Sequence, residues 1–322
     1  QEKDILAEKL KALEKKFGAG TIIMGRDTKE ELEVVDSGSL TLNLATNIGG
    51  LPVGKLIELL GMESSGKSTL TLHAIANFQK LDGKCVLVDY EQSFDRAYAT
   101  ALGVDMDKLI IIQPECMEDG YNMTEELIKT GDIRLVVHDS HTAAMPRKVV
   151  DGEVGDVTIG LQARLNSQGL GKIKPLLRDN RCTMMGISQI RQNVGGYGDP
   201  NQSTGGLAWK FYSDMRMKVN KSVDKENEGN KTTVEIIKNK CSAPFGKAEF
   251  VIDWGKGISR MMEIISLAQE LKFITRSGAW YTLPNVEKSV QGEQGVLQFL
   301  SDNPEYATEI ERQVLEKLKE LK

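Results

Sequence analysis

The sequence predicts an α/β fold with a mostly parallel, twisted sheet that helices cover on both faces. Between residues 34 and 258, apolar runs alternate with stretches of helical periodicity. Runs that are apolar at nearly every position are typical of parallel strands buried on both faces. Such runs are Lys55–Leu60, Cys85–Tyr90, Leu109–Gln113, Leu135–Asp139 and Thr183–Ser188.

Three further apolar runs follow one another so closely that little chain remains for crossover helices. They are Met215–Val219, Thr232–Ile237 and Ala248–Ile252. Because parallel neighbours need long connections, we expect these three strands to be antiparallel at one edge of the sheet.

The two ends of the chain differ in character from this core. Residues 4–17 carry leucines at helical spacing, and a short β-prone run follows at 21–24. One helix and one strand cannot bury themselves, so this segment must dock on the core or on a neighbouring subunit. From Ser259 the pattern indicates a small α+β domain, with a strand at 277–283 and a final helix starting at Pro304. The predicted segments are therefore 1–33, 34–258 and 259–322.

The composition is that of an ordinary globular chain. Of 322 residues, 40% are hydrophobic and 27% are charged, and the formal net charge is −5. Because the chain is mildly acidic, a polyanionic partner must be met by a local basic surface. No apolar stretch reaches the ~18 residues of a membrane span. The four cysteines form no C-x-x-C pair, which favours reduced thiols in a cytoplasmic protein.

A phosphate-binding motif lies at the centre of the predicted core. Residues 61–68, GMESSGKS, match G-x-x-x-x-G-K-[ST] in full, between an apolar run and a helical pattern. The glycines let successive backbone N–H groups turn toward phosphate oxygens, and the helix N-terminus adds its positive dipole end. Lys67 would reach the β- and γ-phosphates of a nucleoside triphosphate, and Ser68 would ligate Mg²⁺.

Polar residues at the ends of neighbouring strands complete the predicted chemistry, because ligands bind at the carboxyl ends of parallel strands. Asp139 ends one apolar run, as expected of a carboxylate that holds Mg²⁺. Glu91 follows another run and is a candidate general base for the attacking water. Gln189 ends a third run and could report the presence of the γ-phosphate to the segment after it.

Two polar, glycine-rich segments, 151–160 and 191–206, interrupt the regular pattern. The second is too long for an idle connection, so we expect it to be functional. The histidines, by contrast, are interpreted as structural. They are His73, His138 and His141.

Short motifs along nearly the whole chain resemble those of the RecA family of recombinases, and they occur in the family's order. They are SGSL at 37–40, GGLP at 49–52, GMESSGKST at 61–69, QIR at 189–191, STGG at 203–206, KNK at 238–240, APF at 243–245 and GAWY at 278–281. The resemblance implies a P-loop ATPase core, an N-terminal helix–strand element that docks on the adjacent subunit, and a small C-terminal domain.

The resemblance also implies an ATP-dependent recombinase that assembles as a filament on single-stranded DNA. Such a filament pairs with a homologous duplex and exchanges strands in recombinational DNA repair, and hydrolysis of ATP with Mg²⁺ allows release. The implied partners are single-stranded and duplex DNA, further copies of the chain, and loader or repressor proteins.

Individual site residues follow from the resemblance by position. Glu91 matches the catalytic glutamate, with Lys67 and Gln189 completing the catalytic set, and Lys238 and Lys240 match lysines that reach ATP across the subunit interface. The ATP-binding set is Gly61, Met62, Glu63, Ser64, Ser65, Gly66, Lys67, Ser68, Thr69, Asp95 and Tyr98. The DNA-binding set is Glu153, Val154, Gly155, Gly160, Arg164, Arg191, Asn193, Tyr197, Thr204, Gly205 and Gly206.

Several positions depart from the family's pattern. Met62 replaces a proline, Tyr90 and Gln92 flank Glu91 where a small residue and a histidine are common, and Gly171 replaces a basic residue. Basic positions of the second, duplex-holding surface are also replaced, and nearby lysines are candidates to compensate. The replaced positions are Thr233 and Glu235, and the lysines are Lys218, Lys221 and Lys225.

Two alternatives stay open from the sequence. The weakened basic pattern is compatible with an accessory paralogue, a DNA-binding mediator that does not exchange strands. A ring-shaped helicase motor would share the P-loop chemistry but would not explain the KNK and GAWY motifs. The set of matched site residues is complete, which argues against the accessory protein. These residues are Glu91, Gln189, Lys238 and Lys240.

Overall fold

The computed structural model describes residues 5–18, 22, 32–153, 156, 160–190, 206–223 and 230–320. The chain divides into two compact units, residues 1–33 and 34–322. The first unit holds helix α1 (Ile5–Phe17), which has Glu8 in its first turn and lysines in its last turn, as the helix dipole favours. The strand predicted at 21–24 falls outside the described residues, apart from Ile22.

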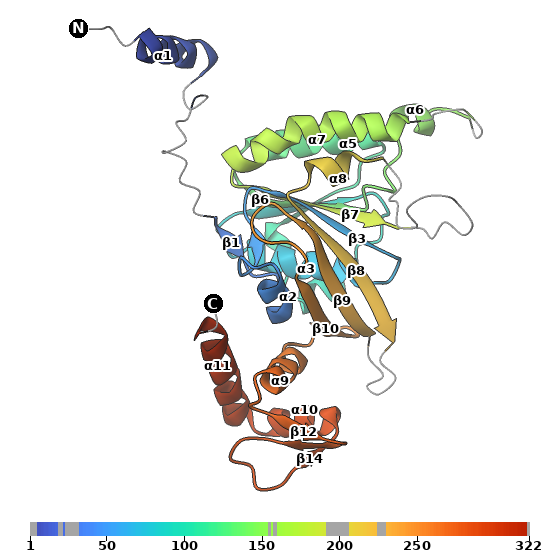
Figure 1. The fold of residues 1–322 in the computed structure, drawn as a ribbon. Coiled ribbons are helices and arrows are strands. Elements are labelled where there is room, and N and C mark those ends of the chain that lie inside the picture. Colours follow the sequence, from blue (N-terminus) through green and yellow to red (C-terminus); the bar gives the residue numbers. More distant parts are fainter. Residues whose placement is uncertain are drawn as a thin grey trace, which may run out of the picture. The chain divides into compact units, whose positions relative to one another are not determined.

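The second unit is built on a twisted sheet that has nine strands in the described part of the chain (Figure 1). Their order across the sheet is β11-β10-β9-β8-β3-β7-β6-β4-β5. The strands are β3 (Leu56–Gly61), β4 (Lys84–Asp89), β5 (Leu109–Ile112), β6 (Ile133–Asp139), β7 (Thr183–Gln189), β8 (Met215–Val223), β9 (Asn230–Asn239), β10 (Lys247–Asp253) and β11 (Gly257–Ile258).

The predicted α/β class with a mostly parallel sheet is confirmed. Neighbours from β8 through β3, β7, β6 and β4 to β5 pair in parallel, whereas β8 to β11 pair antiparallel. The expectation for the late strands was incomplete, because β8 is antiparallel to β9 but parallel to β3. The chain between β7 and β8 is long enough for this crossover and contains helix α8 (Ala208–Tyr212).

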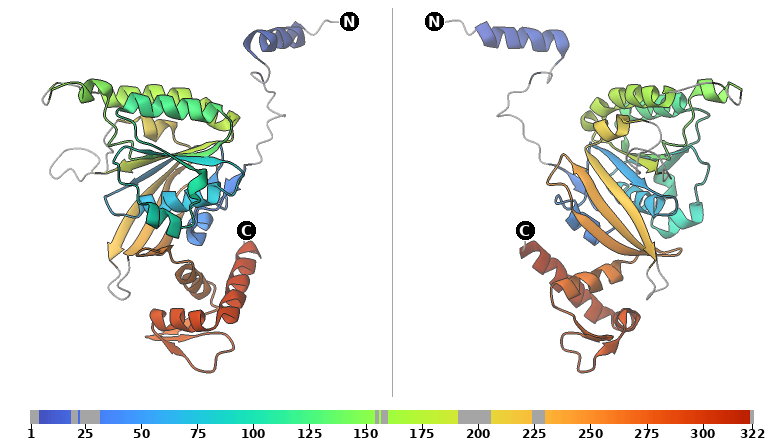
Figure 2. Two further views of the ribbon diagram at one scale, coloured as in Figure 1. Left: turned by 180° about the vertical axis from the view of Figure 1, so that it is seen from behind. Right: turned by 45° about the vertical axis from the view of Figure 1, so that its right-hand side comes forward.

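Helices cover both faces of the sheet, as Figures 1 and 2 show. One face packs against α2 (Leu40–Ala45), α3 (Lys67–Phe78) and α4 (Arg96–Ala101), and the other packs against α5 (Met117–Lys129), α7 (Leu161–Asp179) and α8. The remaining short elements of this core are β1 (Val34–Val35), β2 (Leu51–Pro52), α6 (Arg147–Val150) and a 3₁₀ turn at Met106–Lys108.

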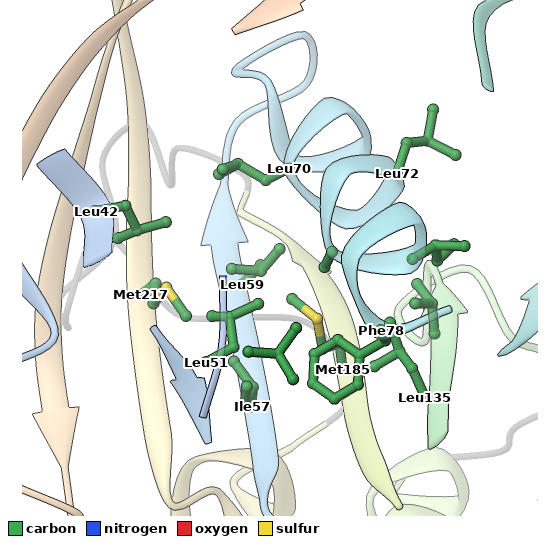
Figure 3. Close-up of a cluster of buried hydrophobic side chains, with 14 of the residues drawn as sticks. Leu42, Leu51, Ile57, Leu59, Leu70, Leu72, Phe78, Leu135, Met185 and Met217 are labelled. Carbon is green, nitrogen blue, oxygen red and sulfur yellow. The ribbon is translucent and has the colours of Figure 1, made fainter. Parts of the chain in front are cut away.

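Strand β3 shows why its sequence is apolar at successive positions. Side chains alternate between the faces of a strand, so a strand covered on both faces buries both sets. Ile57 and Leu59 pack with Phe78 of α3 on one face (Figure 3), and Leu56 packs with the cluster that contains Trp209 of α8 on the other. Burial on both sides fixes the end of β3, and with it the start of the phosphate-binding motif.

The chain after β11 forms a small α+β domain with its own apolar cluster. Its elements are α9 (Arg260–Glu270), β12 (Thr275–Ser277), β13 (Trp280–Thr282), β14 (Val290–Gln291), α10 (Glu293–Asp302) and α11 (Pro304–Glu320). The strand predicted at 277–283 contains β13, but the predicted start was wrong, because β12 and β13 form an antiparallel hairpin whose turn is at 278–279. Gly278 lies at the turn with φ +61°, a left-handed conformation that reverses the chain.

The four cysteines form no disulfide in the described part of the chain, and three of them are buried. Cys85, Cys116 and Cys182 are buried thiols. Within the described ranges, no helix combines the length and the apolar character needed to cross a lipid bilayer.

Glu263 joins the C-terminal domain to the core. Its carboxylate is buried and accepts hydrogen bonds from the Ser39 hydroxyl (2.6 Å), the Leu40 N–H (3.0 Å) and the Thr41 N–H and hydroxyl (3.0 and 2.7 Å). These donors lie at the N-terminus of α2, where backbone N–H groups lack helical partners and the dipole favours an anion. The contact therefore gives the buried Glu263 carboxylate its hydrogen-bond donors and gives the N-terminus of α2 an acceptor.

We expect Glu263→Ala to lower the free energy of unfolding by about 2–4 kcal/mol, because buried donors of α2 lose their acceptor. Urea denaturation measures this change. Glu309→Ala, which removes an exposed ion pair with Arg312 on α11, is the control and should leave the unfolding midpoint unchanged. Equal behaviour of the two variants would contradict the role given to Glu263.

Candidate functional site

The phosphate-binding motif forms a tight loop between β3 and α3. Gly66 precedes the helix with φ +99°, and a side chain there would lie 2.6 Å from Ile252 Cδ1. Gly61 ends β3 against β8, and a side chain there would lie 2.4 Å from the Val219 carbonyl oxygen. Both motif glycines are therefore required by the backbone path, and the N–H groups at the start of α3 remain available for an anion.

A cavity of about 620 Å³ opens beside this loop. One wall is the motif itself, from Ser64 to Thr69, and another is the start of α4, with Asp95 and Tyr98. The Thr69 and Tyr98 hydroxyls are hydrogen-bonded at 2.9 Å and so join these two walls. Asp95 also caps α4 by accepting the Tyr98 N–H at 3.0 Å.

The third wall comes from β8, β9 and the turn after β10, and sequence reasoning missed it. It contributes Lys221, Thr232 and Trp254. The Trp254 side chain is 81% exposed, so its indole face is open to a planar ligand. Lys221 was a candidate for a duplex-holding surface, whereas the structure places it at this cavity. An aromatic residue two positions after the apolar run 248–252 was the one signal that could have indicated this wall.

Three predicted ATP-binding residues, Gly61, Met62 and Glu63, do not line the cavity, whereas Lys67 lines it and is hydrogen-bonded to two of them. Met62 and Glu63 are exposed. The Lys67 ammonium donates to the carbonyl oxygens of Gly61 (2.9 Å) and Met62 (2.6 Å) and lies 3.4 Å from Ser65 Oγ. Burial lowers the pKa of Lys67, and the nearby carboxylates of Asp139, Glu91 and Glu63 oppose that shift. A cation is therefore held at the helix start by backbone oxygens, where phosphate oxygens could replace them.

The ends of β4, β6 and β7 bring the predicted catalytic residues together. Glu91 Oε1 accepts the Gln189 amide N–H at 2.8 Å and the Ser140 hydroxyl at 2.5 Å. The Thr142 hydroxyl in turn accepts the backbone N–H of Gln189 at 3.2 Å. Sequence reasoning identified Glu91 and Gln189 but missed the serine, because Ser140 differs in nothing locally from other residues that follow a strand.

Carboxylates crowd around Asp139. Asp139 lies directly opposite Asp89 in the pairing of β4 with β6, and its Oδ2 accepts the Ser68 hydroxyl at 3.2 Å. Burial first, and the charge of Glu91 second, raise the pKa of Asp139 to about 6. Asp89 has a structural role, since its carboxylate accepts the N–H groups of Ser93 and Phe94 at 3.2 Å each.

This donor set suits a hard divalent cation. The hydroxyl of Ser68 and the carboxylate of Asp139 are adjacent oxygen donors. A cation would stabilise the charged carboxylate, whose pKa is raised by burial first and by the charge of Glu91 second. Among the residues that the structure describes, no group of three His, Cys, Asp or Glu side chains could hold a metal ion by itself. The remaining ligands would thus come from phosphate oxygens and water, as Mg²⁺ prefers.

The two predicted interface lysines lie away from the cavity of their own chain. Lys238 is on β9, and its ammonium donates to the carbonyl oxygens of Lys210 (2.7 Å) and Phe211 (3.1 Å) on α8. Burial first, and the cations of Lys240 and Arg216 next, lower the pKa of Lys238. Lys240 follows the end of β9, and neither lysine lines the cavity.

The predicted DNA-binding residues are only partly described. Glu153 is exposed, Gly160 caps α7 with φ +73°, Arg164 is exposed on the first turns of α7, and Gly206 has φ +85°. The other members of this set lie outside the described residues. They are Val154, Gly155, Arg191, Asn193, Tyr197, Thr204 and Gly205.

Comparison with known protein families decides how this site is to be interpreted. Residues 4–259 match the RecA N-terminal domain, and residues 262–319 match the RecA C-terminal domain. The chain belongs to the RecA family. Proteins named "Protein RecA" are similar to it over nearly its whole length. The relative from Thermotoga petrophila is 43% identical over 328 residues, covering 98% of this chain and 92% of the relative.

Relatives from other bacteria agree with this assignment. The Protein RecA of Streptomyces venezuelae is 43% identical over 315 residues, which cover 96% of this chain and 83% of the relative. The Protein RecA of Thermotoga maritima is 43% identical over 328 residues, covering 98% and 92%. RecA proteins are DNA-dependent ATPases that bind DNA and assemble into filaments. The recombinase function predicted from the motifs is confirmed, and nothing favours an accessory paralogue.

The raised Asp139 pKa leads to a pH-dependent prediction for the protein without nucleotide and Mg²⁺. Below about pH 4 the carboxyl is protonated in both folded and unfolded chains, and above about pH 6 the folded protein must bury its charge. Wild-type stability should therefore fall relative to Asp139→Asn as the pH rises, by about 1 kcal/mol between about pH 5 and about pH 7.

Urea unfolding of both proteins across this pH range measures the difference. In a Glu91→Gln background the transition should move to lower pH, because a neighbouring negative charge has been removed. A stability difference between wild type and Asp139→Asn that does not depend on pH would contradict the assigned environment.

Proposed function

We propose that the cavity binds ATP with Mg²⁺ and that the chain, assembled on single-stranded DNA, pairs it with a homologous duplex and exchanges strands. The observation that carries the proposal is the contact between Glu91 and Gln189. Gln189 is the last residue of β7, immediately before the segment that resembles a DNA-binding loop. One hydrogen bond therefore joins the nucleotide side of the sheet to the proposed DNA side.

In this proposal the phosphate-end residues have distinct roles. Lys67 would exchange its carbonyl partners for β- and γ-phosphate oxygens, and Ser68 and Asp139 would hold Mg²⁺, which neutralises phosphate charge. Glu91 would orient and deprotonate the attacking water. Gln189 can bond either the Glu91 carboxylate or a γ-phosphate oxygen, so its amide would distinguish ATP from ADP.

The aromatic residues that line the cavity are suited to the nucleoside. Tyr98 and Trp254 lie on different walls, and aromatic faces bind nucleobases by stacking. Asp95 also lines the cavity and supplies a carboxylate acceptor. The wall that carries Trp254 thus extends the ATP-binding set beyond the residues predicted from sequence.

We propose that assembly of the chain completes the site. Lys238 and Lys240 are cations outside the cavity of their own chain, so they would act on ATP held by a neighbouring subunit, as an arginine finger does in trans. Segment 1–33 would be the polymerisation element, and Leu6 of α1 is 67% exposed. Segment 34–258 would be the ATPase core, and 259–322 the C-terminal domain.

The DNA-binding surface would consist of the segments at 153–160 and 190–206 together with Arg164. Exposed arginines and backbone N–H groups bind phosphates without reading sequence, which suits a protein that must accept any strand. We propose that the protein acts in the cytoplasm, where its partners would include loader or repressor proteins in the response to DNA damage.

The deciding measurement is ATP hydrolysis with and without single-stranded DNA over a series of protein concentrations. We expect strong stimulation that rises with protein concentration, because filament assembly brings Lys238 and Lys240 to a neighbour's site. Replacing both lysines by alanine should lower the stimulated rate by about two orders of magnitude. Lys67→Ala should abolish hydrolysis with or without DNA.

Lys247→Ala removes an exposed cation of β10 that pairs with Glu249, and it is the matched control for charge. It should hydrolyse ATP like the wild type. If wild-type protein binds DNA but its rate of ATP hydrolysis does not rise, the proposed recombinase mechanism is contradicted. Normal stimulation in the double lysine variant would contradict the role of Lys238 and Lys240 at the interface.

A second prediction tests the missed wall of the cavity. Trp254→Ala should raise the ATP concentration for half-maximal hydrolysis by about tenfold, the effect of losing one base–aromatic stack. Trp280→Ala in the C-terminal domain is the control, since that indole is also exposed, at 51%, but does not line the cavity. Equal ATP dependence in the two variants would show that the indole does not hold the base.

A further inference from the structure

A chain of buried polar side chains runs across the central strands on the face covered by α8. The His141 Nε2 lies 2.6 Å from the Ser188 hydroxyl, which donates to Glu58 Oε1 at 2.7 Å. Glu58 Oε2 accepts the Arg216 Nε–H at 2.5 Å. His141, Ser188 and Glu58 are buried, with Glu58 fully so. Such a chain in an apolar interior is stable only when its members are mutually hydrogen-bonded.

The direction of these hydrogen bonds fixes the state of the imidazole. The Glu58 carboxylate can only accept, so the Ser188 hydroxyl proton points to it, and Ser188 must accept from His141. His141 therefore carries its proton on Nε2. Its Nδ1 has no hydrogen-bond partner among the described residues.

His141 contacts both sides of the segment at 190–207. Before this segment, the His141 ring is hydrogen-bonded to Ser188 of β7, and the backbone N–H of His141 donates to the Ile187 carbonyl oxygen at 3.2 Å. On the outgoing side its ring stacks on Trp209 of α8, with centroids 4.2 Å apart and planes 11° apart. Gly186 of β7 allows this approach, since a side chain there would lie 2.2 Å from the Trp209 ring.

The same face leads to the two groups that act on ATP. Ser188 is adjacent to Gln189, whose amide binds Glu91. Helix α8, which carries Trp209, also supplies the carbonyl oxygens that hold Lys238, and Arg216 lies opposite Lys238 in the pairing of β8 with β9. A shift of α8 would therefore reach Lys238 directly and Gln189 through His141 and Ser188.

We propose that His141 is a positioning residue that couples DNA binding at 190–206 to ATP hydrolysis, by holding Ser188 and α8 in a fixed relation. The inference rests on the proposed function, because it assumes that DNA acts on this segment. His141 does not line the cavity. It acts through Ser188 on the Gln189 amide, and through Trp209 on the helix that holds Lys238.

The decisive variant is His141→Phe, measured in the full-length protein with ATP and poly(dT) as the single-stranded DNA. Phenylalanine keeps a ring to stack on Trp209 but cannot donate to Ser188. We expect the maximal DNA-stimulated rate to fall about fivefold or more, the range of coupling between two sites. The rate without DNA and the ATP concentration for half-maximal hydrolysis should stay unchanged. His141→Gln, whose amide replaces the Nε2–H donor, should restore most of the stimulation.

Thr124→Val is the matched control. It removes the hydrogen bond (3.0 Å) of the other buried imidazole on this face, His138, which has no hydrogen bond with Ser188 among the described residues. The variant keeps the ring contact of His138 with Trp209, whose centroids are 6.5 Å apart. It should keep full stimulation, so that a loss in His141→Phe cannot be a general effect of losing a buried histidine hydrogen bond. Full stimulation in His141→Phe, or an equal loss in Thr124→Val, overturns the proposal.

Two further measurements test the proposal even if His141→Phe does not fold. Ser188→Ala removes the acceptor without adding volume and should lose stimulation to the same extent, whereas normal stimulation in Ser188→Ala overturns the proposal. In wild-type protein, long-range ¹H–¹⁵N spectra of the three histidines should show His141 as the neutral Nε2–H tautomer. An Nδ1–H tautomer overturns the proposal.

The outcome for the wild type separates the two levels of inference. If poly(dT) does not stimulate wild-type hydrolysis, the proposed function fails, and this inference falls with it. If poly(dT) stimulates wild type and His141→Phe equally, the proposed function stands and only the role of His141 is overturned.

Discussion

The parallel alignment of β3, β7, β6 and β4 is the constraint on which the site depends. Parallel strands end at the same edge, so the residues after them converge whatever their distance in sequence. Gly61 lies opposite Gln189, and Asp89 lies opposite Asp139, in the register of these strands. The phosphate loop, the general-base candidate Glu91 and the proposed γ-phosphate sensor Gln189 are therefore placed together by backbone hydrogen bonds, before any of their side chains interact.

This convergence has an electrostatic consequence. Asp139 and Glu91 share a partly buried edge with Lys67. Burial first, and the charge of Glu91 second, raise the pKa of Asp139 to about 6. Lys67 is satisfied by carbonyl oxygens that a phosphate could replace. Two carboxylates therefore lie beside a lysine whose carbonyl partners can be exchanged. This arrangement favours a divalent metal and a polyphosphate that bind together.

The polar side chains buried within the sheet bond to one another, whereas those at the carboxyl ends of the strands are placed to bind ligands. Glu58 and Arg216 lie opposite each other on β3 and β8, and Ser188 and His141 extend this pair toward the edge. A buried pair of charges is weak evidence for stability, because desolvation offsets most of the attraction. A directional hydrogen-bonded chain instead restricts how strands and α8 can move relative to one another. Glu263 restricts the C-terminal domain in the same way, through the N-terminus of α2.

The sequence alone determined the fold class, because buried apolar runs alternate with helical patterns along the chain. It also determined the phosphate loop and the positions of Asp139, Glu91 and Gln189 at or just after strand ends, because these follow from local patterns. Tertiary structure decided the rest. The parallel pairing of β8 with β3, and the positions of Lys221 and Trp254 at the cavity, depend on which distant strands become neighbours. Local periodicity carries no record of that pairing, since side-chain alternation is the same in parallel and antiparallel strands.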